Sequence, residues 1–132
     1  MTEREASCSC GQLRLVAKGE PIRISMCHCL ACQRRTGSAF GFQARFPADR
    51  VSIEGRSTEF VRLSDEDGRA RHFHFCPECG ATVYYRLADA PDAIAVPIGG
   101  FADPSFPAPR ISIYEARRHP WLSLPPDMEH HD

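Results

Sequence analysis

The stretch Cys27-His28-Cys29-Leu30-Ala31-Cys32 brings three cysteines close together in the chain. Four more form two close pairs, in Cys8-Ser9-Cys10 near the start and in Cys76-Pro77-Glu78-Cys79-Gly80 past the middle. Thiolates clustered in this way are typical zinc ligands. The grouping of all seven cysteines in a chain of 132 residues therefore predicts a small fold organised around zinc.

Disulfide cross-links are the alternative explanation for a short chain rich in cysteine. The first residues, Met-Thr-Glu-Arg-Glu-Ala-Ser, lack the apolar segment of a secretory signal, and no apolar run is long enough to span a membrane. Seven is an odd number, and the Cys-x-Cys pairs are too close to bridge internally without strain. We therefore expect reduced cysteines and a cytoplasmic location.

The composition is that of an ordinary globular domain, with 42% hydrophobic residues, 25% charged residues and a formal net charge of -1. Fifteen arginines and one lysine are scattered along the chain without a basic block, which argues against nucleic acid as a partner. We expect one zinc-binding domain over residues 5–125 and a frayed tail at residues 126–132.

Apolar and polar residues alternate with a period of two in several short runs, which predicts strands. In the clearest run, residues 40–46, phenylalanine and alanine alternate with glycine, glutamine and arginine. Other expected strands span residues 13–17, 51–54, 59–63, 72–75, 83–85, 93–97 and 110–114. A helical turn or two fits residues 31–36, and Asp-Glu-Asp-Gly at residues 65–68 predicts a hairpin tip. We predict an all-β fold of short antiparallel sheets.

Cys8, Cys10, Cys76 and Cys79 are the candidate ligands of a structural zinc ion. In an extended segment Cys8 and Cys10 would point to the same face. The Cys-Pro-x-Cys-Gly sequence would form a tight turn with Gly80 at positive φ and with backbone N–H groups directed at the thiolates. Two such pairs supply the four ligands that structural zinc prefers. The alternative is that Cys8 and Cys10 are unrelated surface thiols.

Cys27, Cys29 and Cys32 have the spacing of three ligands to a second ion, with no obvious fourth thiol. An open position is typical of catalytic rather than structural zinc. Because three thiolates make the ion a poor Lewis acid, such a site would hold a substrate thiol as thiolate rather than acidify water. His28 should point to the other side of an extended segment, so we do not count it as a ligand.

The cysteine segments resemble the signature blocks of the glutathione-dependent formaldehyde-activating enzyme (GFA) family, which is grouped with centromere protein V. The similar blocks read CSCG at residues 8–11, CHCLACQRRTGS at residues 27–38 and FCPECG at residues 75–80, with further similarity at residues 97–104 and 111–122. The resemblance runs from about Cys8 to Leu124. Three cysteine blocks in the same order make it specific.

This resemblance implies a complex all-β fold shared with a small zinc protein that acts on Rab GTPases. It also implies a structural zinc ion held by the first and third blocks and a labile zinc ion held by the middle block. The reaction associated with the family joins the glutathione sulfur to formaldehyde and gives S-(hydroxymethyl)glutathione, which is carbon-sulfur lyase chemistry. Cys27, Cys29 and Cys32 are then the expected catalytic residues.

Arg34 and Arg35 directly follow the third of these cysteines and are candidates to bind the two carboxylates of glutathione, because guanidinium groups bind carboxylates bidentately. The alternative is that both are ordinary surface arginines. Two other functions stay open at this stage: a non-catalytic zinc-binding module for protein or chromatin contacts, and the same thiol chemistry on another small thiol or aldehyde. The sequence does not indicate an oligomeric state.

Overall fold

The structure, a computed structural model, describes residues 1–64 and 67–132. Within these residues the strands form a three-stranded sheet in the order β1-β2-β5 and an eight-stranded sheet in the order β11-β10-β3-β4-β9-β8-β7-β6. The small sheet contains β1 (Glu3–Ser7), β2 (Arg14–Lys18) and β5 (Val51–Glu54). The large sheet contains β3 (Arg23–Cys27), β4 (Gly41–Pro47), β6 (Thr58–Leu63), β7 (Ala70–Phe75), β8 (Thr82–Leu87), β9 (Ala90–Pro97), β10 (Ile111–Ile113) and β11 (Glu129–His130).

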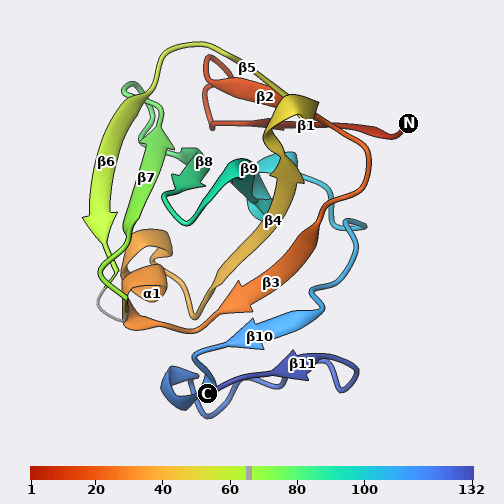
Figure 1. Ribbon diagram of the computed structural model, residues 1–132, viewed down its shortest axis with the longest axis vertical. Helices are drawn as coiled ribbons and strands as arrows, with labels where there is room; N and C mark the ends of the chain where they lie inside the picture. Colours follow the sequence, from red (N-terminus) through yellow and green to blue (C-terminus); the bar gives the residue numbers. More distant parts are fainter. Residues whose placement is uncertain (65–66) are drawn as a thin grey trace.

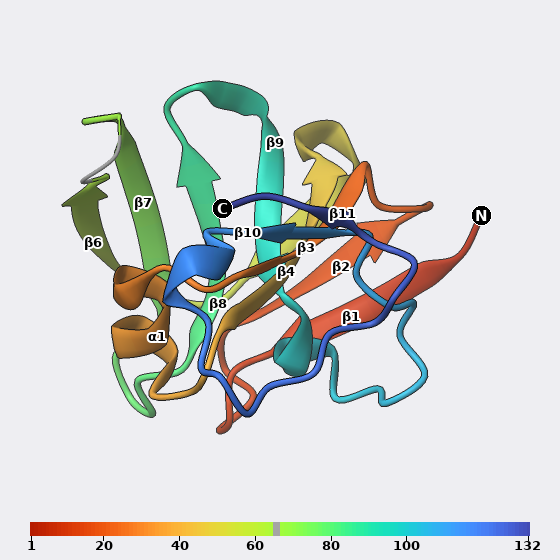
Figure 2. The ribbon, with the colours of Figure 1, turned by 90° about the horizontal axis from the view of Figure 1, so that it is seen from below.

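The prediction of an all-β fold is confirmed. The helices described are α1 (Leu30–Thr36) and the 3-10 turns η1 (Ala48–Arg50), η2 (Ile98–Phe101) and η3 (Glu115–Arg117). None of them has the length and hydrophobicity needed to cross a membrane. The large sheet curves from β10 through β3 and β4 toward β6, and α1 lies beside β6 and β7 in both views (Figures 1 and 2).

Most of the strands lie where the alternating pattern predicted them, but β1, β3 and the short β11 were missed. β1 has the polar sequence EREAS, with one buried residue, so its alternation is weak. In β3 the four residues from Ile24 to Cys27 are all buried, because this central strand is covered on both faces. A strand covered on both faces has no alternation to detect. Pairing is antiparallel from β3 through to β6, while β10 pairs in parallel with β3 and with β11.

The main core lies between the two sheets. Leu15 of the small sheet and Phe46, Ile94 and Val96 of the large sheet belong to one cluster and are each at most 1% exposed. Because alternate residues of β4 point to opposite faces, Gln43 lies on the side away from Phe46, and it too is buried, at 4% exposed. β4 is therefore covered on its polar face as well, where a half-buried strand was expected.

The C-terminal residues pair with the large sheet, where we expected residues 126–132 to be frayed. Glu129–His130 form β11 beside β10, and the side chain of Met128 is buried at 9% exposed. The backbone N–H of His131 donates to the carbonyl oxygen of Ser112 at 2.9 Å. These backbone bonds and the buried methionine hold a segment whose polar sequence carries no strand signal.

The hairpin tip predicted at residues 65–68 falls in part on residues 65 and 66, which lie outside the described residues. Beside them, the backbone N–H of Gly68 donates to the carbonyl oxygen of Ser64 at 2.8 Å, and Gly68 has a φ of +71°.

We predict that Gly55→Ala destabilises the protein more than Gly19→Ala does. Both glycines have positive φ, +100° and +82°, so both variants incur a conformational cost, about 1–2 kcal/mol. A Cβ at Gly55 would also lie 2.0 Å from the carbonyl oxygen of Gln12, whereas a Cβ at Gly19 would make an ordinary contact of 3.5 Å with Met1. Urea unfolding of both variants measures the difference, and equal losses would contradict the prediction.

Candidate metal centres

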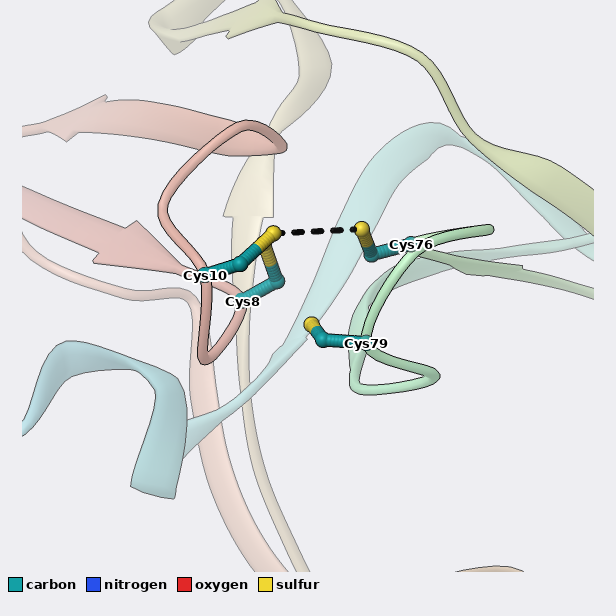
Figure 3. A group of neighbouring side chains, drawn as sticks. All are labelled: Cys8, Cys10, Cys76 and Cys79. Carbon is teal, nitrogen blue, oxygen red and sulfur yellow. Dashed lines mark hydrogen bonds between the residues drawn. The ribbon is translucent and has the colours of Figure 1, made fainter.

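Four cysteine sulfurs converge from two loops, one after β1 and one after β7 (Figure 3). The Sγ atoms of Cys8, Cys10, Cys76 and Cys79 all lie within 4.8 Å of one another. Cys8 and Cys10 are 3.6 Å apart, and Cys10 and Cys76 are 3.7 Å apart. Sulfurs placed ~2.3 Å from a tetrahedral zinc ion are separated by about 3.8 Å. The spacing of this four-cysteine cluster therefore fits one four-coordinate metal ion.

Each pair of cysteines is presented by a turn of similar construction. In both turns the backbone N–H of the first cysteine donates to a carbonyl oxygen further along, at 2.9 Å for Cys8 and 3.0 Å for Cys76. Gly11 and Gly80 close the two turns with φ of +84° and +80°, a conformation that favours glycine. Cys8 and Cys10 thus meet on a turn rather than on the extended segment we predicted, because β1 ends one residue earlier.

Gln12 supports this cluster from the side. Its Nε2 donates to the sulfur of Cys76 at 3.0 Å and to the carbonyl oxygen of Arg56 at 2.8 Å, and its Oε1 accepts from the backbone N–H of Arg56 at 3.0 Å. Although desolvation alone would raise it, the pKa of the Cys76 thiol falls to about 6, because Gln12 and the backbone N–H groups of Cys79 and Glu78 donate to the sulfur. The sequence analysis did not identify Gln12 as a residue of this site. The feature that could have indicated it is its position next to the first cysteine block, residues 8–11.

The second cluster is the cysteine trio of Cys27, Cys29 and Cys32, whose sulfurs also lie within 4.8 Å of one another. Cys27 ends β3, and Cys29 caps the N-terminus of α1, where its sulfur accepts from the backbone N–H of Cys32 at 3.3 Å. Hydrogen bonds from the thiols of Cys27 and Cys32 lower the pKa of Cys29 against the opposing effect of burial. Since the other four cysteines form the first cluster, the trio can hold an ion with three protein thiolates.

His28 points away from the trio, as we expected for a residue between two ligands. It is 0% exposed, and its Nε2 lies 2.9 Å from the hydroxyl oxygen of Ser112 on β10. Burial lowers the pKa of this imidazole, which favours its neutral form. His28 therefore links β3 to β10.

The trio borders a cavity of about 600 Å³. Beyond the cysteines its wall is rich in cations, namely Arg23, Arg35, Arg45, Arg62, Arg71 and Arg117. Among the described residues that line it, Asp132 alone has a carboxylate side chain. Apart from Arg35, none of these arginines was singled out from the sequence. The cavity thus combines thiolates at one end with an excess of guanidinium groups around the rest.

The structure separates the two arginines that we expected to act together. The guanidinium of Arg35 lies over the rings of Phe73 and Tyr85, at 5.0 and 5.6 Å from their centroids, and lines the cavity. A Cβ at Gly41 would lie 3.2 Å from Arg35 Nη2 and 3.3 Å from Cys32 Sγ, so this guanidinium is beside the trio. Arg34 is exposed on α1 and does not line the cavity.

We predict that Gln12→Ala weakens metal binding by the four-cysteine cluster by roughly 10- to 100-fold, the usual effect of removing a group that supports a ligand. Arg56→Ala is the control, because it keeps the backbone groups that Gln12 contacts and removes only an exposed ion pair with Glu78. Competition with a chelator, followed by elemental analysis of the metal retained, compares the two variants. Identical retention would show that Gln12 does not support the cluster.

Comparison with known proteins finds a family match that covers both cysteine clusters and a solved structure with a similar fold. The family profile described as "Glutathione-dependent formaldehyde-activating enzyme" matches residues 3–117. Among solved structures, the crystal structure of a Rhodobacter sphaeroides protein is similar, with a TM-score of 0.55 and 16% sequence identity, over 78% of this chain and 90% of that chain. No curated protein matches the chain.

The likeness to the Rhodobacter sphaeroides structure concerns the fold alone. The family match establishes more than the fold, because it spans most of the chain and includes both cysteine clusters. The chain belongs to the glutathione-dependent formaldehyde-activating enzyme family.

Proposed function

We propose that this protein joins the thiol of glutathione to formaldehyde and gives S-(hydroxymethyl)glutathione, as a zinc-dependent enzyme of the carbon-sulfur lyase type. The observation that carries this proposal is the cysteine trio at the wall of an arginine-lined cavity, in a chain of this family. A thiol site next to cationic side chains suits a thiol substrate that carries carboxylates.

Zinc is the metal that we propose for both clusters. All the candidate ligands are cysteine sulfurs, which select zinc over hard cations such as magnesium and calcium. The four-cysteine cluster would hold a closed structural ion, and the trio would hold an ion with an open position. Bound there, zinc would keep a substrate thiol in its thiolate form. Cysteines that must stay reduced to bind zinc favour a cytoplasmic location.

The side chains around the trio suit the addition of a thiolate to a small aldehyde. In this reaction the sulfur forms a bond to the carbonyl carbon, and the carbonyl oxygen gains the electron pair and then a proton. Tyr85 lines the same cavity, and burial raises its pKa to about 12, so its hydroxyl stays protonated and can donate to that oxygen. Arg35, beside the trio, would bind a carboxylate of the thiol substrate.

The rival function, a non-catalytic zinc module for protein or chromatin contacts, is less well supported. A structural site closes the coordination of its ion with a fourth ligand. His28, the nearest histidine in sequence, is directed to Ser112 instead. The net charge of -1 also gives chromatin little to bind.

We predict that the wild-type protein loaded with zinc accelerates formation of the glutathione-formaldehyde adduct and that Cys29→Ser does not. The reason is that the variant lacks one of the three thiolates of the trio. Exchange NMR of the adduct measures the rate, and the variant should retain the circular dichroism of the wild type and one zinc ion per chain instead of two. A wild-type rate equal to the uncatalysed rate would refute the proposed function.

We predict further that Arg35→Gln raises the KM for glutathione by about tenfold or more, as the loss of a charged hydrogen bond does. Arg34→Gln on the same helix should have a clearly smaller effect, because Arg34 lies outside the cavity lining. The same NMR assay at varied glutathione concentration compares them. Equal effects of the two changes would remove Arg35 from the substrate site.

A further inference from the structure

One face of β3 and β4 forms an ordered floor for the cavity. Arg23, Ser25 and Cys27 share a face of β3, since alternate residues of a strand point the same way. Across the sheet, Arg23 pairs with Arg45, Ser25 with Gln43, and Cys27 with Gly41. All of these except Gly41 line the cavity. The trio therefore lies at one end of this floor and a pair of arginines at the other, about 13 Å away along the strand.

The arginine pair carries two like charges directly across the sheet, an arrangement that is unfavourable by itself. Within the described part of the chain, neither Arg23 nor Arg45 makes an ion pair, and the Nε atoms of both are buried without a hydrogen-bond partner. Burial and the charge of Arg23 lower the pKa of Arg45. Both residues line the cavity, so their guanidinium groups can bind an anion there.

Three other arginines of the cavity have ion-pair or ring contacts, although the Nε atoms of Arg35 and Arg62 also lack a hydrogen bond. Arg71 pairs with Asp89 at 3.4 Å and with Asp67 at 3.5 Å. Arg62 and Arg35 both lie over the ring of Phe73, each at 5.0 Å from its centroid. Arg23 and Arg45 have neither kind of contact among the described residues, so an anionic ligand is the missing partner that their geometry suits.

The middle of the floor is polar and also incompletely satisfied. Gln43 Nε2 donates to the hydroxyl oxygen of Ser25 at 2.8 Å, which fixes the orientation of the amide. Gln43 Oε1 is buried and has no donor among the described residues. A ligand lying along the floor could supply that donor with a peptide or ammonium N–H.

We infer that Arg23 and Arg45 form an anion subsite that binds a carboxylate of the thiol substrate, with Gln43 Oε1 accepting an N–H between that carboxylate and the thiol. The inference rests on the proposed function for the thiol at the trio. It names the substrate class as a short peptide-like thiol whose carboxylate lies at the far end from its sulfur. A small thiol without such a carboxylate would leave the arginine pair unpaired.

Binding of S-methylglutathione to the zinc-loaded protein, measured by isothermal titration calorimetry, tests the subsite without any adduct formation. We expect Arg23→Gln and Arg45→Gln each to weaken this binding by about tenfold or more, while Arg110→Gln, at an exposed position outside the cavity, leaves it unchanged. The wild type should bind the diester of S-methylglutathione at least as weakly as the variants bind the free acid, because esterification also removes the carboxylate that we assign to Arg35. Arg45→Lys keeps the charge but cannot bind a carboxylate bidentately, so its affinity for S-methylglutathione should lie between those of the wild type and Arg45→Gln.

Thermal unfolding separates this role from a structural one. Because each glutamine variant removes one of two facing like charges, its Tm should equal or exceed that of the wild type. Folded variants that bind S-methylglutathione as tightly as the wild type would overturn the subsite, whatever the catalytic assay shows. Equal affinity of the wild type for the diester and for the free acid would overturn it too. Binding that depends on the arginines in a protein without adduct-forming activity would overturn the proposed function and leave the subsite standing.

Discussion

The convergence of four cysteine sulfurs is the constraint on which the rest of the structure depends. Cys10 and Cys76 are 66 residues apart in sequence, yet their sulfurs lie 3.7 Å apart, and they join the small sheet to the large one. A metal ion shared by such sulfurs can contribute on the order of 10 kcal/mol to folding. That contribution matters in a chain of 132 residues whose main core is formed between the two sheets.

The same cluster also positions the cavity, although it does not line it. Cys76 and Cys79 lie in the connection between β7 and β8, so the turn that carries these cysteines determines how the two strands meet. β7 supplies Phe73 and β8 supplies Tyr85, and both rings pack beneath the guanidinium of Arg35. The connection that carries two of the four clustered cysteines therefore also positions the aromatic side of the arginine-lined cavity.

How much the sequence could predict depended on the range of the interaction. The two cysteine pairs, the cysteine trio and most strands followed from local spacing and alternation, because a turn or a half-buried strand shows in the pattern of a few neighbouring residues. The preference of zinc for four ligands then joined the two pairs. The strand from Arg23 to Cys27 shows no alternation of apolar and polar residues, since both of its faces are covered. Without that strand, Arg23 and Arg45 could not be recognised as cross-strand neighbours. Gln12 and the ordered tail likewise depend on contacts with residues distant in sequence.

The distribution of charge in the cavity links stability to function. Three thiolates around a divalent ion would leave the trio with one net negative charge, and Arg35 lies beside it to balance that charge. Among the described residues, no negative charge balances Arg23 and Arg45, which face each other at the far end of the floor. Groups left unfavourably placed in a folded protein are expected where a ligand completes them. A carboxylate at one end and a thiol at the other would satisfy both ends of the cavity at once, which favours a bifunctional substrate over a simple thiol.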